Sequence, residues 1–325
     1  MPTVSVLMPV HNADRYVAKA VDSILGQSWG DWELLTIDDG STDRSRAILE
    51  RYATRDHRIR LTSRPNTGYT VALNELLTQA SGEFVARMDA DDVALPERLA
   101  RQMEYLRANP AVVCVGTAVH FIDDAGRFLR DGHPGLDNDE IQQRILAGDC
   151  VLNHPSVMMR RRAVESVGGY RAEFEPAEDL DLWLRLAEIG RLANLAEPLM
   201  NYRQHPASFS ERHQMLQLER SAAAVLDACR RRGIPPRKIE LSAWRPVDRR
   251  SRMETYLGYG RQGLERGEYG TAWHYGLQAI GQAPWRLGGW GLLARTFGRR
   301  LVRGLRRRSP SHDPEQAARE PAVRS

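Results

Sequence analysis

The chain has 325 residues, of which 42% are hydrophobic and 27% are charged, and its formal net charge is +4. This composition is typical of a globular protein, and the length allows one large α/β domain with an appendage. No run of 18 apolar residues occurs, so a transmembrane helix is not expected.

Cysteine usage and the start of the chain both favour a cytoplasmic location. The three cysteines, Cys114, Cys150 and Cys229, are odd in number, widely spaced and without metal-ligand spacing. A reducing compartment suits them better than a secreted disulfide scaffold does. Residues 1–3 lead directly into an apolar strand, so we expect no signal peptide before the fold.

Three predicted strands of the N-terminal part end in polar residues, and each is followed by a predicted helix. The strands lie at 4–10, 32–37 and 84–86, and the helices at about 17–27, at about 44–53 and after Pro96. The strand ends carry His11 and Asn12, Asp38 and Asp39, and the segment 88–92. In an open parallel sheet these ends share one edge, where ligands bind. The spacing therefore predicts a nucleotide-type ligand held by carboxylates and a metal.

The segment 88–92 places three carboxylates, Asp89, Asp91 and Asp92, within four residues. Clustered carboxylates repel one another, so a fold that keeps them together at a strand end needs positive charge there. A hard divalent cation that bridges a phosphate supplies this charge. The alternative is an acidic, solvated turn before a helix, where aspartate is also favoured, and Asp92 in particular suits such a capping role.

The second part of the chain mixes helix, strand and long connections. Asn109 and Pro110 interrupt the pattern, a strand begins at 112–116, and a hairpin is expected over 119–131. We assign residues 1–110 to a nucleotide-binding half, which also holds a strand near 59–61 and a helix at 71–79, and residues 111–215 to an acceptor half.

The C-terminal part is predicted to be a helical appendage over residues 216–308. Helical patterns cover 215–231 and 252–282, and the stretch 259–273 resembles a single tetratricopeptide-like hairpin. Within the segment 290–308, seven arginines and no acids accompany apolar residues that repeat every four positions. A membrane-surface helix is the first interpretation, packing on the domain is the second, and nucleic-acid binding is the least favoured. The polar segment 309–325 is expected to be disordered.

Seven motifs, in order, resemble those of family-2 glycosyltransferases. They are Pro9-Val10-His11-Asn12, Asp38-Asp39-Gly40-Ser41-Thr42-Asp43, Asn66-Thr67-Gly68, Asp89-Ala90-Asp91-Asp92, Asn153-His154-Pro155-Ser156-Val157-Met158, Glu178-Asp179-Leu180-Asp181-Leu182-Trp183-Leu184-Arg185 and Tyr202-Arg203-Gln204-His205-Pro206. The resemblance covers residues 3–215. It implies the GT-A fold, an α/β architecture with a Rossmann-like, mostly parallel sheet flanked by helices, to which the C-terminal helices are appended.

The resemblance implies a divalent metal, Mn²⁺ or Mg²⁺, with Asp91 and His205 as its protein ligands. One carboxylate of the pair Asp38 and Asp39 would accept the N3–H of uracil. Asp89 would help to hold the ribose or the waters on the metal. The other residues that we assign to the donor nucleotide are Pro9, Val10, His11, Asn12, Asn66, Gly68 and Ala90. His11 departs from the family pattern, because relatives often carry an aromatic residue there.

On the acceptor side, Asp179 is the predicted catalytic base, with His154, Glu178 and Trp183 nearby. A carboxylate in reach of the acceptor hydroxyl can take its proton as the hydroxyl attacks the anomeric carbon. The alternative for Asp179 is a simple cap of the following helix. Asp181 ranks lower because it points away from Asp179.

The sequence thus predicts an inverting glycosyltransferase that moves a sugar from a nucleotide-sugar, a UDP-sugar by preference, to a hydroxyl of a glycan or lipid-linked acceptor. The resemblance together with the basic segment indicates a role in cell-envelope or exopolysaccharide synthesis, in the cytoplasm or at the inner face of the cytoplasmic membrane. The alternative is a non-catalytic, nucleotide-sugar-binding or membrane-associated regulatory paralogue. A nucleotidylyltransferase is disfavoured, since its glycine-rich basic loop is missing from residues 9–14.

Overall fold

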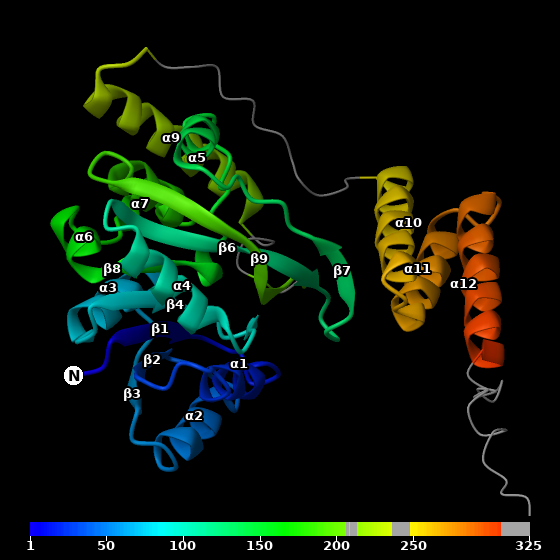
Figure 1. Cartoon of the computed structure of the whole chain (residues 1–325), viewed down its shortest axis with the longest axis horizontal. Coiled ribbons are helices and arrows are strands. Elements are labelled where there is room, and N and C mark those ends of the chain that lie inside the picture. The colour runs from blue at the N-terminus through cyan, green and yellow to red at the C-terminus, as the bar shows by residue number, and fades with distance from the viewer. Residues whose placement is uncertain (206–207, 209–212, 236–247, 307–325) are drawn as a thin grey trace, which may run out of the picture. The chain divides into compact units, whose positions relative to one another are not determined.

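The computed structural model describes residues 1–205, 208, 213–235 and 248–306, with side chains up to residue 301. The chain divides into two compact units between Arg245 and Pro246 (Figure 1). The predicted disordered tail, 309–325, lies outside the described residues. Among the helices within the described ranges, none is both long and apolar enough to cross a membrane.

The first unit alternates strands and helices along its first 110 residues and is less regular after that. Its elements are β1 (Val4–Val10), α1 (Val17–Leu25), β2 (Trp32–Asp39), α2 (Ser45–Ala53), β3 (Ile59–Arg64), α3 (Tyr69–Gln79), β4 (Phe84–Arg87), β5 (Val93–Ala94), α4 (Arg98–Ala108), β6 (Val112–Ile122), β7 (Phe128–Asp131), α5 (Asn138–Ile145), η1 (His154–Ser156), β8 (Met158–Arg160), α6 (Arg161–Ser166), η2 (Ala172–Phe174), α7 (Glu178–Leu186), β9 (Arg191–Arg203) and α9 (Gln214–Arg232).

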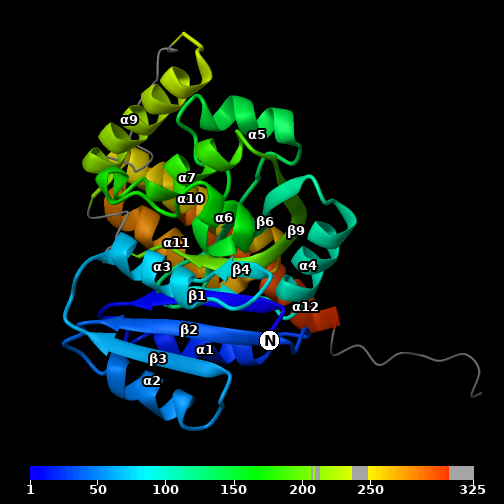
Figure 2. The ribbon, with the colours of Figure 1, turned by 90° about the vertical axis from the view of Figure 1, so that its left-hand side faces the viewer.

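The N-terminal half of the sheet is parallel, as its sequence predicts. Strands β3, β2, β1 and β4 are neighbours in that order, and all their pairings are parallel. Figure 2 shows β1, β2 and β3 side by side. Every residue of β1 and β2 is buried, which fits the mostly apolar sequence of β1 and the apolar residues at 32, 34, 35 and 37 of β2. The carboxyl ends of β1, β2 and β4 therefore open on one edge.

The predicted α/β class is confirmed, and the sheet is mixed rather than mostly parallel. Its path continues from β4 through β8, β6 and β9 to β5, while β7 pairs with β6. The pairs β4–β8, β6–β8, β6–β7 and β5–β9 are antiparallel, and β6–β9 is parallel. The hairpin expected over 119–131 is present as β6 and β7, with β6 running without interruption from Val112.

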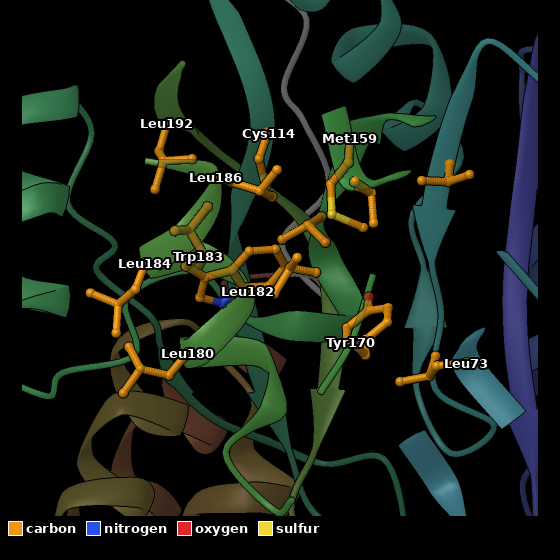
Figure 3. Packing of buried hydrophobic residues seen from close by; sticks show 14 of the residues in the cluster. Leu73, Cys114, Met159, Tyr170, Leu180, Leu182, Trp183, Leu184, Leu186 and Leu192 are labelled. Carbon is orange, nitrogen blue, oxygen red and sulfur yellow. The ribbon is translucent and has the colours of Figure 1, made fainter. Parts of the chain in front are cut away.

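The main apolar cluster of the first unit gathers around α7. Trp183 is completely buried in it, and Figure 3 shows its indole among the leucines of α7 and of neighbouring elements. Helix α9 contributes Ala224, Val225 and Ala228 to the same cluster. The first unit therefore extends past residue 215, where the sequence predicts its end, and α9 belongs to it rather than to the appendage.

The second unit is built from α10 (Arg249–Glu265), α11 (Tyr269–Gln282) and α12 (Leu287–Arg306). The helical hairpin expected over 259–273 is present: α10 and α11 are joined by a turn at Gly267, whose φ of +78° is the left-handed conformation that ends helices. Glycines allow close packing of the helices. A Cβ at Gly260 would lie 2.4 Å from the Leu292 side chain, and one at Gly276 would lie 2.6 Å from the Leu293 side chain.

Candidate functional site

A cavity of about 210 Å³ opens where β4 and β9 end, beside the first turn of α7. Segments far apart in the sequence contribute its walls. Its lining comprises Tyr69, Arg87, Asp89, Asp91, Asp92, Cys150, Leu152, Asn153, His154, Pro155, Pro176, Glu178, Asp179, Tyr202, Arg203, Ser208 and Gln217. The predicted metal-side and acceptor-side carboxylates thus face one cavity.

The carboxylates that follow β4 form a group able to hold a cation. Ligand atoms of Asp89, Asp91 and Asp92 all lie within 4.8 Å of one another. Asp92 is buried, and its Oδ1 accepts the backbone N–H of Arg203 at 2.6 Å rather than capping a turn. Its Oδ2 has no hydrogen-bond partner within the described residues. Burial, with Asp91 and Asp89 close by, raises the pKa of Asp92 well above its usual range, and a cation would relieve this.

Arg87 is the buried counter-charge beneath these carboxylates. Its side chain is 2% exposed, and its Nη1 lies 2.5 Å from Oδ2 of Asp89. Burial lowers the pKa of a guanidinium, but the neighbouring carboxylates outweigh this and raise the pKa of Arg87. The guanidinium also lies over the ring of Tyr69, 5.4 Å from its centroid. Arg87 thus fixes Asp89 in the cavity wall.

His205 and Asp91, separated by 114 positions in the sequence, meet in the structure. Nε2 of His205 lies 2.9 Å from Oδ2 of Asp91. The imidazole packs against Tyr16, with ring centroids 5.1 Å apart. Arg203 connects the segment of Asp91 to the loop after β6, because it donates hydrogen bonds to the backbone carbonyls of Asp91 and Asp123. The two predicted metal ligands are therefore already neighbours. Together with the nearby carboxylate of Asp89 they fit a hard divalent cation.

Most of the predicted donor residues follow β1, β2 and β3 and do not line the cavity, whereas Asp89, after β4, does. Both carboxylate oxygens of Asp39 accept backbone N–H groups at 3.1 Å, one from Thr67 and one from Gly68. Nδ1 of His11 lies 2.9 Å from the Asp39 carbonyl oxygen and 3.2 Å from Nδ2 of Asn66. These contacts bring His11, Asp39, Asn66 and Gly68 into one group.

The other predicted donor residues differ in where their side chains lie. Asp38 and Asp39 are successive strand residues, so their side chains point to opposite faces, and Asp38 lies towards Arg46 of α2. Asn12, with a φ of 50°, accepts the Thr42 N–H at 2.8 Å and so fastens the loop after β2. Pro9 and Val10 are buried at the end of β1, and Ala90 is buried in the turn between Asp89 and Asp91.

Asp179 lies in the first turn of α7 with its carboxylate on the cavity. Its Oδ1 accepts the Leu180 N–H at 2.7 Å, and its Oδ2 accepts the Cys150 thiol at 3.2 Å. Burial raises the pKa of Asp179 above its usual range, and the hydrogen bonds from Cys150 and Leu180 offset part of this rise. The residue that precedes the helix is Ala177, which caps nothing with its side chain. Asp179 is therefore a desolvated carboxylate that two donors keep able to ionise.

Glu178 and His154 form a polar layer beside Asp179. Burial, with Asp179 close by, raises the pKa of Glu178 to about 8, so it is protonated near neutral pH. Its Oε1 lies 3.9 Å from Nδ1 of His154, whose Nε2 lies 2.9 Å from the Tyr170 hydroxyl. Burial also lowers the pKa of His154 well below its usual range, so the ring is neutral. Asp179 is thus the member of this group best suited to accept a proton.

The prediction that Trp183 lies on the acceptor side is wrong. It is completely buried and is absent from the cavity lining, so it does not face an acceptor. Its ring packs edge-to-face on His154 at 5.7 Å and supports that residue from behind. Asp181 points elsewhere, as expected, and is paired with Arg171 and Arg185.

Sequence reasoning missed Tyr69, Arg87, Cys150 and Gln217 as members of the cavity wall. Arg87 could have been predicted, because an arginine within an apolar strand needs a partner of opposite charge. No comparable signal marks Cys150 or Gln217, because α9 and the segment before η1 reach the cavity through the tertiary fold.

Comparison with known proteins gives consistent matches. The model of Glycosyl transferase family 2 matches residues 5–168. EpsE of Bacillus subtilis (strain 168), which carries the name of a glycosyltransferase, is 35% identical over 244 residues, which are 72% of this chain and 84% of its own. The O-antigen biosynthesis glycosyltransferase WbnJ of Escherichia coli is 35% identical over 63% of this chain and 81% of its own.

Among solved structures, S. aureus TarS 1–349 in complex with UDP superposes with a TM-score of 0.54 and 19% sequence identity. The match covers 69% of this chain and 65% of that one. At this identity the similarity concerns the fold of the two chains.

Proposed function

Because the chain belongs to glycosyltransferase family 2 and has its GT-A fold, we propose that it is an inverting enzyme that transfers a hexosyl group from a UDP-sugar to a hydroxyl acceptor. The observation that carries this proposal is the single cavity that joins the carboxylates after β4 to Asp179. A donor diphosphate and an acceptor hydroxyl need such adjoining sites, because the reacting atoms must be in contact.

Asp39 is the proposed acceptor of the uracil N3–H, within the group that also contains His11 and Asn66. Its carboxylate is buried and fixed by the Thr67 and Gly68 amides, its Oδ1 is also paired with Arg64 at 3.3 Å, and its Oδ2 keeps a second lone pair. TarS, which shares the fold, has been solved with UDP bound. The name of WbnJ supports a role for this chain in the synthesis of O-antigen or a related cell-envelope or exopolysaccharide glycan, on a glycan or lipid-linked acceptor.

Asp91 and His205 are the proposed protein ligands of a divalent cation, Mn²⁺ or Mg²⁺, with Asp89 held close by through Arg87. Such a cation would neutralise the negative charge that develops on the nucleoside diphosphate as it leaves. The unpartnered Oδ2 of Asp92 and the mutual proximity of the carboxylates support this assignment.

Asp179 is the proposed general base. It would take the proton of the acceptor hydroxyl while that oxygen forms its bond to the anomeric carbon and the bond to the diphosphate breaks. One displacement of this kind inverts the anomeric centre. Glu178 is protonated near pH 7 and burial lowers the pKa of His154 well below its usual range, so Asp179 is the better proton acceptor at that end of the cavity.

A donor screen tests the proposal. The full chain is incubated with UDP-, GDP- and dTDP-sugars, with Mn²⁺ or with EDTA, and release of the free nucleoside diphosphate is measured. We expect slow release of UDP from at least one UDP-sugar, and loss of that release in EDTA. Binding of UDP without release from any donor, even with acceptor glycans added, would favour the non-catalytic, nucleotide-sugar-binding alternative.

A further inference from the structure

Helix α12 carries two apolar faces, and its own unit uses one of them. Leu292 and Leu293 are buried against α10 and α11. Trp290, Phe297 and Leu301 are 52%, 63% and 56% exposed. Their spacing of seven and then four residues places them along a single helix face, distinct from the packed one. Packing of the second unit therefore accounts for one of the faces and leaves the other in solvent.

Helix α11 extends this exposed surface. Gly276 meets Leu293, and Ile280 meets the backbone at Gly289, so these positions mark where α11 touches α12. Trp273 and Leu277, which are 45% and 50% exposed, lie beside that contact on the side away from α10. Trp290, Phe297 and Leu301, the exposed stripe of α12, also lie beside the contact between α11 and α12, on the side away from α10.

Two further apolar side chains lie where α11 passes into α12, Trp285 of the turn at 75% and Leu287, the first residue of α12, at 82% exposure. We call this surface the apolar face. Its members are Trp273, Leu277, Trp285, Leu287, Trp290, Phe297 and Leu301. Three exposed tryptophans in one helical hairpin are far more than the scattered apolar residues of an ordinary surface.

The charges within the segment that carries the apolar face have one sign. Residues 269–308 contain eight arginines and no aspartate or glutamate. Arg295, Arg299 and Arg300 are exposed on α12, away from the stripe that contains Phe297. A helix that lies in a membrane interface typically combines tryptophan and leucine with arginine. Its rings lie among the acyl chains, and its guanidinium groups contact anionic headgroups.

From this combination we propose that the apolar face docks on an anionic lipid surface, with α11 and α12 lying on the membrane rather than crossing it. The uniform positive charge selects negatively charged headgroups, each arginine near the surface adding to the attraction. A protein partner that buried three tryptophans would not need this charge, and no described helix of the chain is able to span the bilayer. This proposal stands apart from the sugar-transfer chemistry and would survive its failure.

Sedimentation with vesicles tests the proposal on the full chain. Vesicles of pure phosphatidylcholine are compared with vesicles that contain phosphatidylglycerol, at 50 and 500 mM salt. We expect binding to the anionic vesicles at low salt, at least tenfold weaker binding to the neutral ones, and a residual apolar contribution at high salt. Lack of binding to anionic vesicles at low salt would overturn the proposal.

Two double variants separate the contributions of the rings and the charges. Trp285→Ser with Phe297→Ser should weaken binding at both salt concentrations by tenfold or more, whereas Arg295→Gln with Arg300→Gln should weaken it mainly at low salt. Ile189→Ser, on the first unit and 52% exposed, is the matched control and should bind as the unaltered chain does.

Size-exclusion chromatography and UDP titration complete the test. Unchanged UDP affinity in every variant would show that the first unit is intact. A dimer that the Trp285 and Phe297 substitutions dissociate, without vesicle binding by the unaltered chain, would assign the apolar face to a second copy and overturn the proposal. Equal vesicle binding by the unaltered chain and the ring variant would overturn it as well.

Discussion

Replacement of Arg87 by methionine tests whether the carboxylates after β4 depend on a buried counter-charge. Methionine keeps most of the length of the side chain and removes the charge. Arg87 is 2% exposed, so its loss leaves Asp89 and the buried Asp92 without their cation. Removing one partner of a buried ion pair costs about 3–5 kcal/mol. The Asp89 side chain is 29% exposed, which places the expected loss near the lower end, about 3 kcal/mol.

For a unit of this size, such a loss lowers the melting temperature by about 6–12 °C. The loss should shrink when Mn²⁺ is added, because the ion supplies the missing positive charge. It should also shrink as the pH falls from 7.5 to 5.5, because the carboxylates, whose pKa values burial already raises, take up protons.

Thermal unfolding followed by circular dichroism, at both pH values and with EDTA or Mn²⁺, measures these effects. Arg101→Met is the control, since Arg101 makes exposed ion pairs that contribute little. A melting point within 2 °C of the unaltered chain at pH 7.5, or a loss that is independent of Mn²⁺ and pH, would refute this account of Arg87.

Three further substitutions probe the acceptor side and the packing of α7 behind it. Asp179→Asn should lower turnover by about 10² or more while UDP affinity stays within twofold, as rates of UDP release and calorimetry would report, and a loss below fivefold would identify another base. Asp181→Asn should lower the free energy of unfolding in urea by about 3–5 kcal/mol, because it leaves Arg185 buried without its carboxylate. An unchanged urea midpoint for that variant would contradict this. Cys150→Ala should move the acid limb of the pH–turnover profile to higher pH, because Asp179 loses a donor that lowers its pKa and is protonated sooner as the pH falls. An unmoved limb would mean that the thiol does not tune Asp179.

The parallel half of the sheet could be predicted because each of its strands has a recognisable local sequence pattern. β1 and β2 are rich in apolar residues, and each is followed by an amphipathic helix, a pattern that has few alternatives. The antiparallel half could not, because β8 has three residues, Met158–Arg160, too few to show any periodicity. Its place between β4 and β6 is decided by pairing across long sequence separations.

The candidate site shows the same division. Polar residues at strand and helix ends follow recognisable motifs, and this is why the sequence could place Asp91 and Asp179 at one cavity and His205 beside Asp91. Trp183 was misassigned because it lies within a motif, although its position on the apolar side of α7 makes it core. Cys150 was missed because the contact of its thiol with the carboxylate of Asp179 joins residues 29 positions apart.

The boundary of the appendage was predicted too early for a related reason. Helix α9 is amphipathic and rich in polar residues, much like the helices that follow it. Its small residues, Ala224 and Ala228, fit against α7 and the main apolar cluster, and no local signal distinguishes such docking from an independent helix.

The central claim is that the carboxylates after β4 hold a divalent cation together with a nucleoside diphosphate. Isothermal titration of the chain with UDP, in Mn²⁺ and in EDTA, tests it most directly when Asp91→Asn is compared with the unaltered chain and with Asp139→Asn, an exposed aspartate of α5. The account predicts UDP binding that requires Mn²⁺, a loss of at least tenfold in affinity for Asp91→Asn and no loss for Asp139→Asn. UDP affinity that is the same with and without Mn²⁺, or the same in Asp91→Asn and the unaltered chain, would contradict it.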